Sequence, residues 1–268
     1  MLRIAMGLHN AGDYHLHSLT CLHTVLARAS CPVRLYLLHD ATVTPAQQAL
    51  FAQLVGAFSA EARFVNLEQY APLLRAHERG SFSIATFFRL LIPQCLPGME
   101  ILYLDSDICL TLDVAELVSE LAGWEECIGA VADAALCMER FAQWVSELGV
   151  EAGRYFNAGV LYLHTGRLNA RFPHFFADTV ALLQRRRYNF PDQDVLNLYC
   201  APHAGLVRYL PEKYNYSLSV RQRHLLPPEA LAGKVLHYGY HKPWAAVFPA
   251  GVVYWQARSA MLRLLGLA

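Results

Sequence analysis

Apolar runs alternate with longer amphipathic segments over the first 65 residues of the chain. Residues 2–7 form a short apolar run typical of a buried strand, and residues 15–29 place leucines and valines on one helical face. Two further runs, residues 33–38 and 62–65, enclose a helix that Thr44-Pro45 opens as N-cap and first-turn proline. This alternation indicates βαβ units, so the sequence predicts an α/β protein whose mainly parallel sheet carries helices on both faces.

The same patterns continue to the C-terminus. Helices are expected at residues 82–91, after Asp113, at 165–187, from Pro191 and at 254–265, and strands at 101–104, 126–132, 155–163 and 234–236. The helix at 165–187 ends in Arg185-Arg186-Arg187, whose positive charges suit the negative end of a helix dipole. We favour this structural explanation of the arginines over an anion site.

Composition limits the class of protein. The 268 residues are 55% hydrophobic and 16% charged, which is typical of one large globular domain, alone or with a modest appendage. Twenty-two basic and 22 acidic residues give a formal net charge of +0. This balance argues against a nucleic-acid partner bound through bulk charge.

Seven scattered cysteines include no Cys-x-x-Cys pair: Cys21, Cys31, Cys95, Cys109, Cys127, Cys137 and Cys200. We interpret them as reduced core residues of an intracellular protein. The first seven residues are too short for the apolar region of a signal peptide, and no apolar run is long enough to cross a bilayer. The expected location is cytoplasmic, with peripheral contact at the inner face of the membrane as a further option.

Two acids follow the apolar run that begins at Ile101, namely Asp105 and Asp107, with Ser106 between them. Ligands of open α/β sheets bind at the carboxyl ends of strands, and paired hard oxygens suit Mg²⁺ or Mn²⁺. The alternative is a turn or a helix cap, which aspartate often forms after a strand. The spacing alone favours that alternative; the neighbouring motifs favour the metal.

Four other segments carry polar residues that could form part of a site. Arg89 lies in an apolar helix, where it either pairs with an anion or extends to solvent. Asn157-Ala158-Gly159 enters a strand, as a place for a ligand to approach the backbone or as an ordinary bulge. Asp192-Gln193-Asp194 occupies a first helical turn, and His237 and Lys242 share a loop with Gly239.

Five segments, taken together and in order, carry a family resemblance: residues 82–90, 102–107, 155–161, 192–194 and 237–244. The set resembles family 8 glycosyltransferases, the retaining group that includes bacterial lipopolysaccharide galactosyl- and glucosyltransferases and glycogenin. The resemblance implies a GT-A (Rossmann-like) fold with a mixed central sheet. It also implies transfer of galactose or glucose from UDP-galactose or UDP-glucose to a saccharide or glycolipid acceptor, such as lipopolysaccharide core.

The resemblance assigns roles by matching position. Asp105, Asp107 and His237 would hold Mn²⁺, with Mg²⁺ as the alternative. The donor-binding residues would be Asp13, Tyr14, Arg89, Ser106, Asn157, Ala158, Gly239 and Lys242, and the catalytic residues Asp192, Gln193 and Asp194. Gln193 would lie beneath the anomeric carbon. An amide is a poor nucleophile, so same-face attack by the acceptor is favoured, and covalent attack by Asp194 is the weaker option.

Two segments depart from the family pattern. The first loop, Asn10-Ala11-Gly12-Asp13-Tyr14, lacks the paired acids that usually address the nucleotide. The His237–Lys242 spacing is one residue shorter than in bacterial members, so His241 is a second candidate for the role of Lys242.

The predicted domain organisation is a catalytic domain at residues 1–244, followed by a short amphipathic C-terminal helix and tail at 245–268. That helix either contacts a membrane surface or packs back on the domain. Two other functions compete with the first one: transfer to a protein or small molecule, and nucleotide-sugar binding without turnover. A dinucleotide-dependent dehydrogenase is disfavoured, because no Gly-x-Gly-x-x-Gly follows the first strand.

Overall fold

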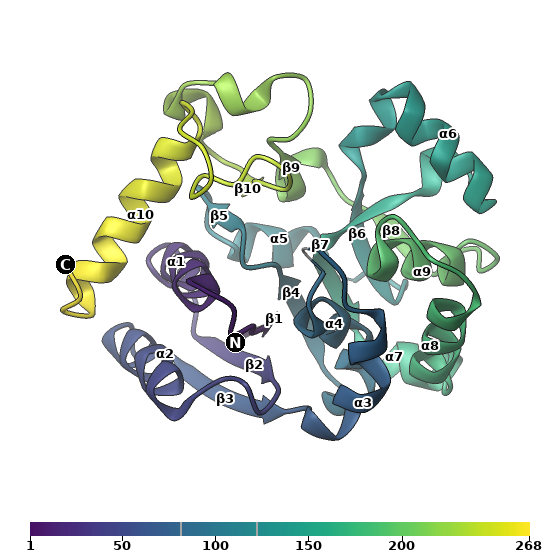
Figure 1. Ribbon diagram of the computed structural model, residues 1–268, viewed down its shortest axis with the longest axis horizontal. Helices are drawn as coiled ribbons and strands as arrows, with labels where there is room; N and C mark the ends of the chain where they lie inside the picture. The colour runs from purple at the N-terminus through teal and green to yellow at the C-terminus, as the bar shows by residue number, and fades with distance from the viewer. Residues whose placement is uncertain (81, 122) are drawn as a thin grey trace.

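The computed structural model describes residues 1–80, 82–121 and 123–268. A seven-stranded mixed sheet runs through the molecule in the order β3-β2-β1-β4-β7-β6-β8 (Figure 1). Its strands are β1 (Leu2–Gly7), β2 (Val33–His39), β3 (Glu61–Asn66), β4 (Glu100–Leu104), β6 (Ile128–Ala132), β7 (Phe156–His164) and β8 (Val207–Tyr209). The α/β class and the mixed, mainly parallel sheet are thereby confirmed.

The parallel half of the sheet follows the predicted βαβ pattern. Strands β1, β2, β3 and β4 are parallel, and α1 (Tyr14–Leu26) and α2 (Pro45–Ala57) connect the first three of them. Thr44 caps α2: its side chain accepts from the backbone N–H of Gln47, whose side chain bonds back to Thr44. Local sequence alone thus specifies where this helix begins.

Strand β7 changes the direction of the sheet. It runs antiparallel to both β4 and β6, and β8 then lies parallel to β6. Side chains of β1 enter hydrophobic cores on both faces, with Ile4 in one and Ala5 in the other. Apart from Arg3 the strand is apolar, because both of its faces are covered.

The helix predicted at residues 165–187 is two helices, α7 (Thr165–Arg171) and α8 (Phe175–Arg185). Pro173 lies between them, and proline cannot donate an intrahelical hydrogen bond and restricts the residue before it. Phe172 accordingly leaves the helical conformation, with φ −138° and ψ 70°. The prediction of one helix was wrong because it did not account for this proline.

The remaining helices cover the faces and ends of the sheet: α3 (Ala71–Leu74), α4 (Ile84–Cys95), α5 (Ala115–Glu120), α6 (Glu139–Leu148), α9 (Pro191–Cys200) and α10 (Gly251–Leu264). The cysteines are free, and Cys137 is exposed on a short 3-10 turn, so it is not the core residue that was predicted. Within the described residues, no helix is long and apolar enough to cross a membrane.

A second, three-stranded sheet pairs a strand from the C-terminal part of the chain with the strand that follows Asp107. It consists of β5 (Ile108–Leu110), β10 (Val235–His237) and β9 (Tyr216–Ser217), in the order β5-β10-β9. The register places His237 opposite Ile108, and the N–H of Tyr238 donates to the carbonyl of Asp107 at 3.1 Å. This antiparallel pairing is what brings His237 beside the acids that follow β4.

Helix α10 lies against α1, with Tyr254 and Met261 buried (Figure 1). Its opposite face exposes Val252 and Trp255. The helix therefore packs back on the domain through one face while leaving apolar side chains on the other.

Candidate active site

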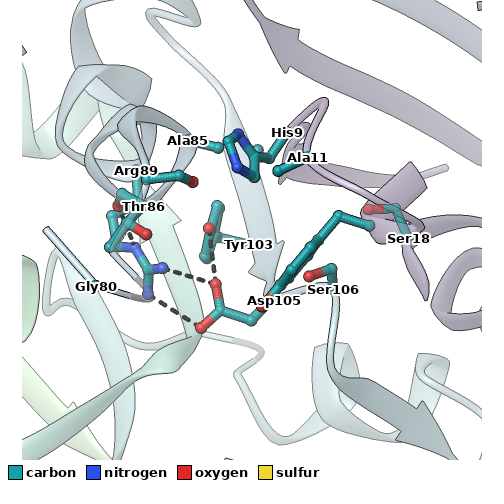
Figure 2. A pocket seen from close by; sticks show the side chains of 13 residues that line it. His9, Ala11, Ser18, Gly80, Ala85, Thr86, Arg89, Tyr103, Asp105 and Ser106 are labelled. Carbon is teal, nitrogen blue, oxygen red and sulfur yellow. Dashed lines mark hydrogen bonds and ion pairs between the residues drawn. The ribbon is translucent and has the colours of Figure 1, made fainter. Parts of the chain in front are cut away.

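Asp105 begins a turn at the carboxyl end of β4, where its backbone N–H donates to the carbonyl of Gly159 at 2.9 Å. Its carboxylate accepts hydrogen bonds from Arg89 Nη2 at 2.6 Å and from the Tyr103 hydroxyl at 2.9 Å (Figure 2). The side chain stays partly exposed, at 24%. Asp105 is therefore fixed in orientation and still open to a ligand.

Asp107 is almost fully buried and surrounded by donors. Lys242 Nζ forms an ion pair with its Oδ2, the N–H of Gly239 donates to the same atom at 3.0 Å, and His237 Nε2 lies 3.4 Å away. Burial opposes ionisation, yet the charges of Lys242 and His237 hold the pKa of Asp107 far below its usual range. Asp107 is thus a carboxylate, the form that a metal ligand requires.

Asp105, Asp107 and His237 together offer ligand atoms that all lie within 4.8 Å of one another. His237 Nδ1 is 2.9 Å from Asn215 Oδ1, a contact that orients the ring with Nε2 toward the acids. Two carboxylates and one imidazole suit Mn²⁺, and the oxygens also suit Mg²⁺. The residues present fit a divalent cation.

Gly159 leaves room for this cluster. A Cβ added there would lie 2.3 Å from His237 Cε1 and 3.0 Å from Asp105 Oδ2. Only glycine therefore allows strand β7 to approach the imidazole and the carboxylate so closely.

Arg89 is 5% exposed, so the alternative in which it extends to solvent is wrong. Besides Asp105, its guanidinium contacts Asp192 Oδ2, 3.1 Å from Nε. Burial of the cation is compensated by these two acids, which together raise the pKa of Arg89. Arg89 thus connects the acids after β4 with the first turn of α9, and its partners within the protein are the carboxylates of Asp105 and Asp192.

The first turn of α9 carries the Asp-Gln-Asp motif inward. Gln193 Oε1 accepts from the N–H of Ala158 at 3.1 Å, and Nε2 donates to Asp133 Oδ2 at 2.9 Å and to the Tyr155 hydroxyl at 3.1 Å. Asp194 accepts from the Tyr155 hydroxyl and from the N–H of Phe190. Both oxygens of Asp194 are therefore already bonded to the protein.

Asp192 pairs with the cation Arg89, whereas Asp194 is bonded to neutral donors. Burial, offset in part by the charge of Arg89, raises the pKa of Asp192 to about 6. Burial also raises the pKa of Asp194, against the lowering effect of its bond from Tyr155. The two acids titrate above the usual range of aspartate.

Asn157 lies beside the β-bulge between β6 and β7, so the bulge that was considered for this segment is present. Its Nδ2 donates to Asp133 Oδ2 at 3.0 Å, and its Oδ1 accepts from Asn215 Nδ2 at 2.9 Å. Asn157 thus links the His237 side of the site to the Gln193 side.

Four residues of this network were missed: Tyr103, Asp133, Tyr155 and Asn215. Asp133 directly follows strand β6, as Asp105 follows β4, so an acid at a strand end was a usable signal. Tyr155 begins one of the five segments of the resemblance but was given no role of its own, and Asn215 carried no signal, because its partners are distant in sequence.

A cavity of about 240 Å³ adjoins Asp105, between the first loop and α4 (Figure 2). Tyr14, Arg89 and Ser106, three of the residues predicted to bind the donor, line it. Asp13 is not among the lining residues; its carboxylate is 65% exposed and lies 3.5 Å from Arg258 of α10. The chain thus brings Tyr14 to the cavity, while Asp13 faces the C-terminal helix.

Gly239 and His241 complete the loop after β10. Gly239 has φ +53°, the left-handed conformation that favours glycine, and this turns its N–H toward Asp107. His241 instead stacks on His224, with ring centroids 3.9 Å apart. Lys242 therefore reaches the acids despite the short spacing, without help from His241.

The fold and this clustering agree with the comparison to protein families. Residues 4–247 match the sequence profile of Glycosyl transferase family 8. The chain therefore belongs to that family, and its fold is the GT-A, Rossmann-like fold.

Two curated relatives are similar over part of their length. Lipopolysaccharide 1,2-glucosyltransferase of Escherichia coli (strain K12) is 28% identical over 186 residues, which are 63% of this chain and 52% of the relative. The human xylosyl- and glucuronyltransferase LARGE2 is 27% identical over 249 residues, 84% of this chain and 32% of LARGE2. The chain thus spans about half the length of the bacterial relative.

Solved structures show the same fold. Galactosyltransferase LgtC, in complex with donor and acceptor sugar analogs, superposes with a TM-score of 0.73 at 22% identity, covering 99% of this chain and 95% of LgtC. The bifunctional glycosyltransferase WbbM gives a TM-score of 0.76 at 17% identity, covering 99% of this chain and 51% of WbbM.

Proposed function

We propose that the chain is a metal-dependent retaining hexosyltransferase that moves galactose or glucose from a UDP-sugar to a saccharide acceptor, with lipopolysaccharide core as the leading candidate. One observation carries this proposal. Asp105, Asp107 and His237 converge within 4.8 Å beside a cavity of about 240 Å³, in a member of family 8.

On the metal side, Asp105, Asp107 and His237 would hold Mn²⁺ or Mg²⁺. The cation would supply positive charge for the diphosphate of the donor and for the UDP that leaves. Lys242, which pairs with Asp107, would be free to contact the diphosphate if a cation bound that carboxylate. Tyr14 and Ser106 line the space assigned to the nucleotide, and Asp13 reaches it only if its contact with Arg258 opens.

On the sugar side, Asn157, Ala158 and Asp192 would receive the hexose hydroxyls, and Gln193 would lie beneath the anomeric carbon. Asp194 is held by Tyr155 and Phe190, so it serves to fix the network rather than to attack. This arrangement supports same-face attack by the acceptor hydroxyl, whose proton passes to the leaving diphosphate.

We place the protein in the cytoplasm, with peripheral contact at the inner face of the membrane through the exposed side chains of α10, Val252 and Trp255. Flotation with anionic vesicles tests this contact. Trp255→Ala should reduce the bound fraction, and equal flotation of the variant would contradict it.

The decisive experiment measures UDP release from UDP-galactose and UDP-glucose with Mn²⁺, Mg²⁺ or a chelator, and analyses products by mass spectrometry against extracted glycolipids. Wild type should release UDP only with a divalent cation. In Asp107→Ala the rate of UDP release should fall at least about 1,000-fold. Asp113→Ala, outside the site, is the control. UDP binding with no turnover on any acceptor would instead identify a nucleotide-sugar-binding protein, and transfer confined to a protein or small molecule would replace the saccharide acceptor.

A further inference from the structure

A second hollow, of about 130 Å³, lies between the segment before α4 and the end of α8. Three arginines line it: Arg79 from the first of these segments, and Arg186 and Arg187 from the second. A water molecule occupies about 30 Å³ in the liquid, so the hollow has room for a group the size of a phosphate.

None of these arginines forms a close ion pair with a protein acid among the described residues, although the charge of Arg186 acts at longer range on Asp194. Among the described residues, no carboxylate lies within 4.0 Å of their guanidinium groups, in contrast to the paired Arg75, whose Nη2 lies 2.7 Å from Asp40. Glu78 also lines the hollow, but its carboxylate accepts from the N–H of Ile84 at 2.6 Å and lies 3.9 Å from Arg75. The hollow therefore carries an excess of positive charge in a chain whose net charge is +0.

The arginines of the Arg185-Arg186-Arg187 run differ in position at the end of α8. Helix α8 ends at Arg185, and Arg186 is fully extended, with φ −162° and ψ 172°. The chain therefore turns Arg186 and Arg187 out of the helical path and into the wall of the hollow, while Arg185 does not line it. The dipole explanation favoured from the sequence still applies to all three arginines, and the hollow adds a second feature that only Arg186 and Arg187 share.

The hollow adjoins the proposed site through the backbone. Arg79 is followed by Gly80, which lines the donor cavity, and Pro191 lines the hollow directly before Asp192. Consecutive Cα atoms are about 3.8 Å apart, so the hollow lies one residue from the donor cavity at Gly80 and one residue from the first turn of α9 at Pro191. Hydrogen bonds between the backbones of Arg79 and Phe82, at 3.0 and 2.8 Å, hold the first wall in place.

We propose that this hollow binds an anionic substituent, a phosphate or a carboxylate, on the acceptor saccharide. Guanidinium groups pair with either anion in bidentate fashion, and three around one hollow provide more donors than a single anion needs. The assignment to the acceptor rests on the proposed function, because it requires the hexose to be transferred next to the hollow. The anion site itself rests only on the arginines and the hollow.

Calorimetry on the full chain, with Mn²⁺ and UDP present to fill the donor site, tests the anion site. The probes are glucose 6-phosphate, glucuronate and methyl glucoside. Glucose 6-phosphate or glucuronate should bind wild type more tightly than methyl glucoside does. The tighter of these two anionic probes identifies the anion, phosphate or carboxylate, that the hollow prefers. In Arg186→Gln/Arg187→Gln its affinity should fall about tenfold, the size expected for loss of charge-assisted bonds. Arg185→Gln is the matched control and should bind as wild type does.

Equal affinity for the charged and neutral probes in wild type would overturn the proposal, as would equal loss in the Arg185→Gln control. The acceptor assignment is tested by transfer to lactose and to its phosphate ester. The double variant should raise KM for the phosphate ester alone and leave kcat and metal-dependent UDP release unchanged. If wild type binds the anionic probe but never releases UDP, the proposed function fails and the anion site stands. If wild type releases UDP normally but does not bind the anionic probe, the anion site fails and the proposed function stands.

Discussion

Arg89 separates two groups of acids that the protein holds in different ways. Asp105 and Asp107 are surrounded by cationic side chains, namely Arg89, Lys242 and His237. Across Arg89, Asp194 is held by neutral donors, the Tyr155 hydroxyl and the N–H of Phe190. A partly exposed cation such as Lys242 leaves Asp107 open to a competing charge, whereas a buried network of neutral donors fixes geometry. The first group is built to bind charge and the second to stay in place.

Apart from removal of Asp107, the largest effect should come from crowding the metal side. In Gly159→Ala the new methyl would overlap His237, so we expect UDP release at fixed Mn²⁺ to fall at least about 100-fold, as for changes that misplace a metal ligand. Gly153→Ala, where a methyl meets nothing within 4 Å, is the control. Titration of Mn²⁺ should show the loss as weaker metal affinity; unchanged affinity would show that the cluster does not bind the metal.

On the sugar side, Gln193→Ala should lower kcat by about 10- to 100-fold without abolishing transfer, because an amide positions the sugar rather than attacking it. Steady-state kinetics measure this, with the exposed Gln184→Ala as control. Isolation of a hexose covalently attached to Asp194 would overturn same-face transfer.

Asp192, which pairs with Arg89, should determine how KM for the donor depends on pH. With a pKa of about 6, Asp192 becomes a carboxylate only above that pH, so KM for the donor should rise about tenfold between pH 7 and pH 5. Asp192→Asn should lose this limb of the profile. A limb that persists in the variant would belong to another group.

Titration of Asp192 should change stability and activity in opposite directions as pH rises. The folded state holds the Asp192 proton more tightly than the unfolded state does, so the contribution of this group is fully present below pH about 4 and is lost as pH rises through about 6. Urea unfolding of wild type and Asp192→Asn across this range measures the difference.

The smallest effect should come from Tyr155→Phe. Removing the hydroxyl leaves Asp194 and Gln193 each short of one bond, so the free energy of unfolding should fall by about 1–3 kcal/mol. Tyr209→Phe, whose hydroxyl is at the surface, should change it far less. A stability loss in Tyr155→Phe no larger than in this control would mean that the sugar side is not a rigid network.

Periodicity and local chemistry alone specify much of this fold. They predict the strand–helix alternation to residue 66, the Thr44-Pro45 helix start and the placement of Asp192 and Asp194 in a first turn, and all three are present. Each depends on residues within a few positions of one another. At Pro173, where one such local signal was not taken into account, the prediction of a single helix was wrong.

Partnerships between distant residues could be decided only by the tertiary structure. The sequence marked Asp105, Asp107 and His237 one by one, but the antiparallel pairing of β5 with β10 brings the histidine to the acids. The same is true of Asn215 behind the imidazole, and of Asp13, which turns to Arg258 instead of the cavity. Chain neighbours determine a helix or a strand, because their hydrogen bonds and periodicity are local; what a side chain contacts is determined by which surfaces the folded chain packs together.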